Sequence, residues 1–186
     1  MLRTVTASTY IKVPRPLAFG ILAGYEAYRS WVPDVLESRT LVAEGDVAVA
    51  ELVAPTLGSG KLILEFVQSD DAWLMFNQVD RYRRAGLAGR WDLEDADGGA
   101  GVVVRASLSS FTHFFDLRAR RRLRRFLERT LDALASRSHR LAAHGGANGG
   151  AGRRKIFELV RDGDSLRIEF GDAVYELGRR RQGESS

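Results

Sequence analysis

Three histidines are the side chains in this sequence best suited to proton transfer near neutral pH, and they occur at His113, His139 and His144. No two of them have the His-x-x-x-His spacing that places two metal ligands on one face of a helix. The sequence has no cysteine for a thiolate site and no Gly-x-Ser-x-Gly segment that would expose a nucleophilic serine. No glycine-rich loop connects an expected strand to an expected helix, where phosphate groups often bind. We therefore expect no catalytic triad, no metal and no nucleotide cofactor.

A larger set of residues is suited to binding an apolar molecule. Large apolar side chains alternate along residues 62–66, 73–77 and 87–93, and alternation places them on one face of a β-strand. The residues that we expect to face inward are Leu62, Leu64, Phe66, Trp73, Met75, Asn77, Leu87, Trp91 and Leu93, with the opposite faces of the same strands left open. Asn77 is the polar residue that we expect inside, because Trp73 and Met75 share its face. Such a set forms either a filled core or the wall of a pocket.

A series of strands and one long helix must position these residues. Residues 4–13 alternate like a strand, which Pro14 and Pro16 end before a short helix at residues 17–22. Turn residues then separate six further strands, expected at residues 37–43, 47–54, 61–68, 72–82, 85–94 and 101–110. Their short polar connections favour an antiparallel meander, which the N-terminal strand joins. From Thr112, apolar residues at three- and four-residue steps predict a helix to about Ala143.

The stretch Tyr25-Glu-Ala-Tyr-Arg-Ser-Trp31-Val-Pro33 places three aromatic side chains just before a proline. Pro33 disfavours helix at the residue before it, so a short helical segment ends here and the chain turns into a strand. This segment resembles the aromatic-Trp-x-Pro corner of the START / Bet v 1-like superfamily, in the branch of polyketide cyclase/dehydrase or coenzyme Q-binding proteins. The order of the expected elements over residues 1–143 is similar to that superfamily as well.

The resemblance implies an α+β helix-grip domain over residues 1–143, in which a curved antiparallel sheet of about seven strands wraps around the long C-terminal helix. In this superfamily the space between sheet and helix normally holds an apolar or aromatic ligand. The ligand-binding residues would then be Tyr28, Trp31, Leu64, Phe66, Trp73, Met75, Asn77, Trp91 and Phe115. We therefore expect the chain to bind or carry a small hydrophobic molecule such as a lipid, a quinone or a polyketide.

Two alternatives remain open. The first is a polyketide aromatase/cyclase or dehydratase, for which the resemblance implies a pocket arginine near the end of the fourth strand and a tyrosine beside the second. At the corresponding places this sequence reads Gln68-Ser69-Asp70 and Leu36-Glu37, so we favour binding over catalysis. The second alternative is a regulatory or interaction module whose interior is filled by its own side chains.

Basic residues are concentrated in the long helix. The chain has a net charge of +4, and all of its basic residues except Lys12, Lys61 and Lys155 are arginine. A solvated helix face is the simplest interpretation, and transient contact with an anionic membrane surface is the second. We expect no nucleic-acid partner, because no aromatic residue is interleaved with these arginines to stack on bases.

The sequence also bears on the compartment. No window approaches the ~18 consecutive apolar residues of a membrane-spanning helix, and the N-terminus lacks the layout of a signal peptide. Because there is also no cysteine for a disulfide framework, the cytoplasm is the compartment that we expect.

The last 43 residues have a different composition. Residues 144–153 are glycine-rich and predict a flexible linker, and residues 179–186 predict a disordered tail. Between them, residues 154–178 predict three short strands. An appendage of about 25 residues cannot bury enough apolar surface to be stable alone. We therefore expect it to dock on the main domain or on another copy of the chain, which leaves a homodimer open.

Overall fold

The computed structural model describes residues 2–57, 61–69, 71–79, 86–111, 117–143, 158–162, 165–170 and 173–178. The chain divides into two compact units, residues 1–149 and 150–186, each of which is described by itself. Phe115, the expected helix start at Thr112, the linker at residues 144–153 and the tail at residues 179–186 lie outside the described residues.

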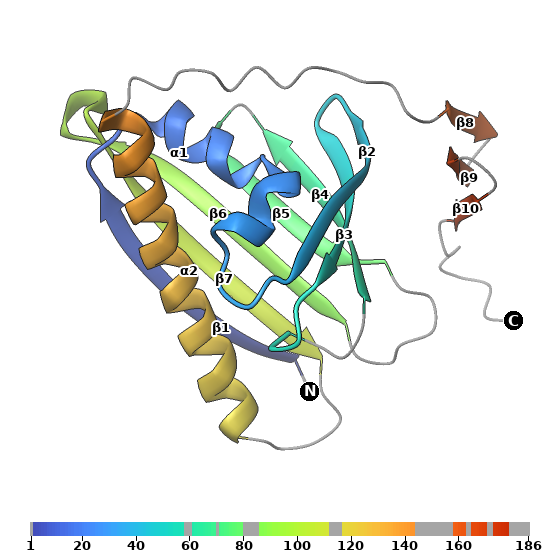
Figure 1. The fold of residues 1–186 in the computed structure, drawn as a ribbon, viewed down its shortest axis with the longest axis horizontal. Coiled ribbons are helices and arrows are strands. Elements are labelled where there is room, and N and C mark those ends of the chain that lie inside the picture. The colour runs from blue at the N-terminus through green and yellow to red at the C-terminus, as the bar shows by residue number, and fades with distance from the viewer. Residues whose placement is uncertain are drawn as a thin grey trace, which may run out of the picture. The chain divides into compact units, whose positions relative to one another are not determined.

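Seven antiparallel strands form the sheet of the first unit (Figure 1). They are β1 Leu2–Ile11, β2 Glu37–Glu44, β3 Val47–Val53, β4 Lys61–Ser69, β5 Trp73–Gln78, β6 Leu87–Ala96 and β7 Gly101–Phe111. Their order in the sheet is β1-β7-β6-β5-β4-β3-β2, so strands β2 to β7 form a meander and β1 pairs with β7. The predicted meander with the N-terminal strand added to it is confirmed.

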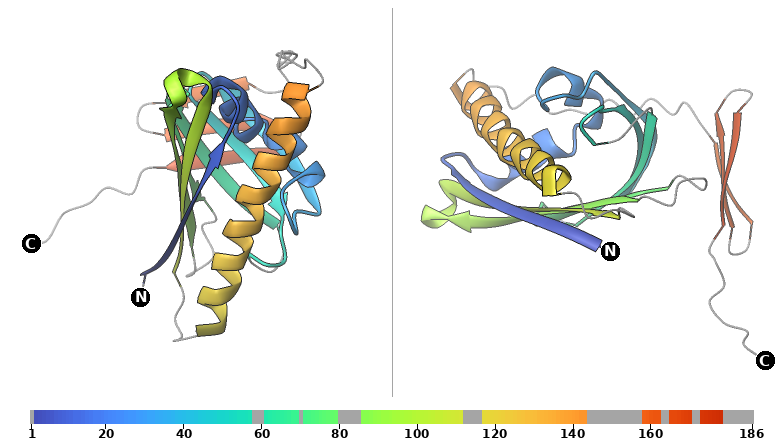
Figure 2. Two further views of the ribbon diagram at one scale, coloured as in Figure 1. Left: turned by 90° about the vertical axis from the view of Figure 1, so that its left-hand side faces the viewer. Right: turned by 90° about the horizontal axis from the view of Figure 1, so that it is seen from below.

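Three helical segments lie on the concave side of this sheet (Figure 2). They are α1 Arg15–Leu22 and the 3-10 segment η1 Tyr25–Ser30, both inserted between β1 and β2, and α2 Leu117–Ala143. Helix α2 crosses the sheet diagonally, where it contacts β1, β7 and α1. The predicted α+β helix-grip architecture is therefore confirmed.

Left-handed backbone conformations make the tight connections in the sheet possible. Gly45 has φ +56° in the turn between β2 and β3, and Gly98 and Gly99 have φ +66° and +92° between β6 and β7. Glycine adopts these angles without the clash that a Cβ atom would cause. The backbone conformation of these two turns therefore explains why the sequence has glycine there.

One face of α2 packs into the core, as its spacing of apolar residues predicts. Its buried residues are Leu123, Phe126, Leu127, Thr130, Leu131, Leu134 and Ser138. The apolar members were expected, whereas the two hydroxyl residues were not. Thr130 donates a hydrogen bond of 2.8 Å to the carbonyl of Phe126 one turn earlier. No helix among the described residues combines the length and apolar character that crossing a bilayer requires.

The predicted inward face of β5 was wrong. Register places Phe66 of β4 opposite Phe76 and Gln68 opposite Leu74, so the inward residues of β5 are Leu74, Phe76 and Gln78. Trp73, Met75 and Asn77 lie on the outer face, where Asn77 is exposed. Here the guanidinium carbon of Arg90 lies 5.1 Å from the centroid of the Trp73 ring, a cation–π contact that stabilises the indole outside the core.

The second unit contains a three-stranded antiparallel sheet. Its strands are β8 Glu158–Asp162, β9 Ser165–Phe170 and β10 Ala173–Gly178, in the order β10-β9-β8. Register aligns Leu159, Ile168 and Tyr175 across the three strands. Three short strands were predicted here, and β9 is the one along which apolar and polar residues alternate.

Candidate functional site

The inner face of the sheet is set by the register of β3 to β6. Phe66 of β4 lies opposite Ala48 of β3 on one side and Phe76 of β5 on the other. Phe76 in turn lies opposite Gly89 of β6, and Leu74 lies opposite Trp91. Directly opposed residues of an antiparallel pair share a face, so these side chains all point to the concave side that the helices cover.

Aromatic rings from η1 meet this inner face. The ring of Tyr25 stacks on that of Phe66, with centroids 4.2 Å apart and an angle of 29° between the planes. Tyr28 approaches Phe66 edge-on at 6.2 Å, and it approaches Trp31 edge-on at 5.4 Å. Phe76 continues the cluster, with its centroid 5.5 Å from that of Phe66. Offset and edge-to-face contacts of this kind fix the rings in place and add to the stability that burial gives.

Small residues alternate with these large ones on the inner face. The inward residues of β3 include Ala48 and Ala50, both buried, and Ala54 follows the strand. At Gly89, an added Cβ atom would lie 2.4 Å from Cε1 of Phe76, so the absence of a side chain lets that ring lie flat over the strand. Small residues in a curved sheet leave room for a neighbouring ring or for a ligand.

Both parts of the interior are buried. Beneath α2, Ile11, Val102, Val104 and Leu134 are 0% exposed. Tyr25, Tyr28, Trp31, Phe76 and Trp91 keep between 6% and 8% of their surface exposed, as do the aliphatic residues Ile21 and Leu123. These five aromatic residues, together with Phe66, form the part of the interior that we call the aromatic part.

The polar groups of the aromatic part are neutral. The hydroxyl of Tyr25 donates to Oε1 of Gln68 at 3.2 Å, and the hydroxyl of Tyr28 donates to the carbonyl of Leu22 at 2.5 Å. Oε1 of Gln78 accepts a hydrogen bond of 3.2 Å from the backbone N–H of Leu87. Burial raises the pKa of Tyr25 above its ordinary value of 10, and it also raises the pKa of Tyr28 well above that value, with repulsion from Tyr25 adding to it. Both phenols therefore stay protonated at neutral pH and act as hydrogen-bond donors.

Three buried side-chain atoms have no hydrogen-bond partner among the described residues. They are Nε of Arg15, the indole N–H of Trp31 and the hydroxyl of Ser138. Ser30 and Arg137, the sequence neighbours of Trp31 and Ser138, are joined by a hydrogen bond of 3.2 Å, so the indole N–H and the Ser138 hydroxyl belong to the region where η1 meets α2. An unmet buried donor costs about 1–3 kcal/mol, which a hydrogen bond to a bound molecule would recover.

Three segments are joined at one side of this region. The carboxylate of Asp34 forms an ion pair with Arg129 of α2 and accepts a hydrogen bond of 3.0 Å from Thr56, which follows β3. Asp34 has φ +62°, in the left-handed region that aspartate tolerates better than most residues. The corner after η1, the loop after β3 and α2 are thereby connected by side chains that water can reach.

The structure brings most of the predicted site residues together. Tyr28, Trp31, Leu64, Phe66 and Trp91 are buried on the inner side of the first unit. Trp73, Met75 and Asn77 are on the outer face, and Phe115 lies outside the described residues. Inner residues missing from the predicted set include Tyr25, Gln68, Leu74, Phe76 and Gln78. Tyr25 and Gln68 had sequence signals, since one belongs to the aromatic corner and the other continues the alternation of Leu64 and Phe66. A ligand-binding role for all of these residues stays a prediction.

A search of curated proteins finds no match for this chain. The family model described as "Polyketide cyclase / dehydrase and lipid transport" matches residues 3–139, which include every element from β2 to β7 and most of α2.

Solved structures with the same fold include proteins of different activities. The Zhui aromatase/cyclase from Streptomyces sp. R1128 is 18% identical, with a TM-score of 0.65 over 79% of this chain and 100% of that chain. A START superfamily protein from Mycobacterium smegmatis is 15% identical, with a TM-score of 0.64 over 74% of this chain and 98% of that chain. A STAR-related lipid transfer protein from Xanthomonas axonopodis is 20% identical, with a TM-score of 0.62 over 74% of this chain and 86% of that chain.

At these identities the solved structures show the fold alone, which is START / Bet v 1-like. The family model adds sequence evidence over more than half of the chain. The chain belongs to the polyketide cyclase/dehydrase and lipid transport family.

Proposed function

We propose that the first unit binds a small, mainly apolar molecule between the sheet and α2, and carries or sequesters it in the cytoplasm. The observation that carries the proposal is the aromatic part of the interior. Rings from η1 and from strands β4 to β6 meet there beside Ala48, Ala50 and Gly89, the small residues of the inner face. Burial of apolar ligand surface would supply ~25 cal/mol per Å² toward the affinity.

The polar groups of the site indicate what else the ligand carries. The indole N–H of Trp31 is only a donor, and it has no partner among the described residues. A ligand oxygen that accepts a hydrogen bond, such as a ketone, quinone or ester carbonyl, would pair with it. The proposed ligand class is therefore a lipophilic molecule with at least one carbonyl or ether oxygen, which includes lipids, quinones and polyketides.

One observation supports a second candidate function, which is polyketide cyclisation or dehydration. Two protonated hydroxyls belong to the same interior, that of Tyr25 beside Gln68 and that of Tyr28 beside the carbonyl of Leu22. Such donors can orient a carbonyl chain for ring closure, since orientation alone accelerates intramolecular reactions. We favour binding, because hydrogen bonds from neutral donors are the chemistry that these described groups provide.

A titration with the neutral fluorescent lipophile N-phenyl-1-naphthylamine tests the proposal. Trp31 and Trp91 lie inside and Trp73 lies outside, so a Trp73→Phe variant confines tryptophan emission to the interior. We expect saturable energy transfer to one bound probe per chain, with a dissociation constant in the micromolar range, roughly −8 kcal/mol. A linear, non-saturating signal, or the same signal from the urea-unfolded chain, would contradict binding in the interior.

A further inference from the structure

Positive charge is segregated onto α2. Residues 117–143 contain nine arginines against Glu128 and Asp132, a formal charge of +7, whereas the whole chain carries only +4. The rest of the chain therefore sums to −3. A general preference for arginine in the genome would change the choice between arginine and lysine, but it would not collect the positive charge on one helix.

The first turns of α2 hold the densest part of this charge. Six exposed arginines lie within eight residues, at positions 118, 120, 121, 122, 124 and 125. We call these six residues the arginine patch. They form the like-charged i,i+4 pairs 118/122, 120/124 and 121/125, and they lie at the positive end of the helix dipole. Both features oppose helix stability, so the patch is not explained by folding.

Arginines of the sheet are arranged differently. Arg90 pairs with Asp92 at 2.7 Å, Arg105 pairs with Glu94 at 2.5 Å, and Glu51 pairs with both Arg39 and Lys61. In the patch, Arg124 pairs with Glu128 at 2.9 Å. Asp116, Glu128 and Asp132 are the carboxylates nearest to the six arginines in sequence, so the patch keeps an excess of positive charge whatever ion pairs it makes.

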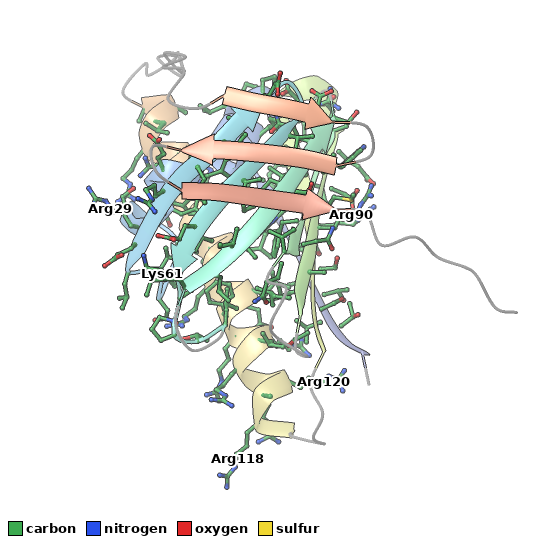
Figure 3. All side chains as sticks on the ribbon, turned by 90° about the vertical axis from the view of Figure 1, so that its right-hand side faces the viewer. Arg29, Lys61, Arg90, Arg118 and Arg120 are labelled. Atoms are coloured by element: carbon green, nitrogen blue, oxygen red, sulfur yellow. The ribbon has the colours of Figure 1, made fainter. Side chains whose placement is uncertain are left out.

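The position of the patch suits a flat partner. The first turns of α2 extend past the end of the neighbouring strands (Figures 1 and 2). Arg118 and Arg120 point outward at this end, far from Lys61 and Arg90 on the sheet (Figure 3). Leu36 is the most exposed large apolar side chain among the described residues, at 63%, and it lies two residues after Asp34, which is ion-paired with Arg129 of the same helix. A cluster of basic residues of this size is attracted to the negative surface of an anionic bilayer.

We propose that the arginine patch docks the protein on an anionic lipid bilayer. The choice of a membrane rests on the proposed function, because a carrier of lipophilic molecules must collect or deliver them at a lipid phase. The described exposed residues of α2 include no phenylalanine, tyrosine or tryptophan to stack on a base, so a nucleic acid fits the patch less well. Contact is electrostatic, and it must weaken as salt rises.

Co-sedimentation with vesicles of pure phosphatidylcholine and of phosphatidylcholine with 30% phosphatidylglycerol tests the proposal on the full chain. We expect binding to the anionic vesicles alone, with loss of binding as NaCl rises toward 0.5 M. Each basic residue near an anionic surface contributes about fivefold to the partition constant, so the triple variant R120Q, R121Q, R125Q should bind about 100-fold more weakly.

The triple variant R90Q, R105Q, K61Q is the matched control, because it removes the same net charge from exposed positions on the sheet. It should bind anionic vesicles about as well as the unchanged protein. Equal loss in both triple variants, equal binding to both kinds of vesicle, or binding to a 20-base-pair DNA duplex without binding to vesicles would overturn the proposal. The probe titration run on the same variants separates the two proposals, since loss of the membrane contact leaves probe binding unchanged.

Discussion

The Ala50→Trp variant is expected to remain folded and to lose binding of N-phenyl-1-naphthylamine by at least about tenfold. Ala50 is fully buried on the inner face of β3, opposite Leu64 of β4. If the interior holds a molecule, the indole of the variant takes the place of that molecule. The substitution then lowers the free energy of unfolding by no more than the usual cost of overpacking, about 1–3 kcal/mol. The probe titration and urea unfolding of the same sample measure both quantities.

A matched substitution on the other face is the control for this prediction. Ala88 of β6 lies opposite exposed Asn77, so it belongs to the outer face. Ala88→Trp should leave probe binding unchanged, and Ala50→Leu should reduce it by less than Ala50→Trp does. If Ala50→Trp binds the probe like the unchanged protein, the ligand does not occupy this interior. If both substitutions at Ala50 unfold the chain while Ala88→Trp is tolerated, the interior is already filled by its own side chains, as an interaction module would have it.

Stability should fall steeply above pH 10 because of two buried phenols. Burial raises the pKa values of Tyr25 and Tyr28 in the folded state above their ordinary value of 10. A raised folded-state pKa contributes stability that is fully present below pH 10 and is lost as pH rises toward the folded-state pKa, because the unfolded chain ionises first. Each phenol should lower the free energy of unfolding by about 1.4 kcal/mol per pH unit in this range, or roughly 5 kcal/mol for both by pH 12.

Urea unfolding at pH 8, 10, 11 and 11.5 checks this slope. Tyr25→Phe and Tyr28→Phe should each remove the contribution of one phenol to the slope above pH 10. At pH 8, each loses one hydrogen bond, to Gln68 or to the carbonyl of Leu22, at a cost of about 1 kcal/mol. The unchanged protein and the double Phe variant could instead lose free energy of unfolding equally fast above pH 10. The phenols would then be hydrated in the folded state, which would contradict their burial in the site.

The fold was predictable from sequence because its signals agree with one another. Short polar turns, including Gly45 and Gly98 with positive φ, separate strands that pair with their neighbours in the chain. The three- and four-residue spacing in α2 gives one buried face, on which Leu123, Phe126 and Leu134 lie as expected. The rings of the aromatic corner before Pro33 pack against the inner face of the sheet.

The inward face of β5 was not predictable, because Trp73, Leu74, Met75 and Phe76 are all apolar. Alternation identifies a face only where apolar and polar residues differ, and this strand lacks that contrast. Two contacts with another strand determine which face of β5 points inward. The flat backbone at Gly89 accepts the ring of Phe76 inside, and Arg90 covers the indole of Trp73 outside. Both partners come from β6, about fifteen residues away, so a reading of β5 by itself could not reveal them.

Native mass spectrometry of the freshly purified protein tests the central claim most directly. We expect a fraction of the unchanged chain to carry an added mass of one lipophilic molecule, which organic extraction would release and identify as a carbonyl- or ether-bearing compound. The Ala50→Trp variant, purified in parallel from the same host, should appear at its bare mass, and Ala88→Trp should keep the adduct. An adduct that persists in Ala50→Trp at the level of the unchanged protein, or a bare mass for the unchanged protein even after incubation with N-phenyl-1-naphthylamine, would contradict the account.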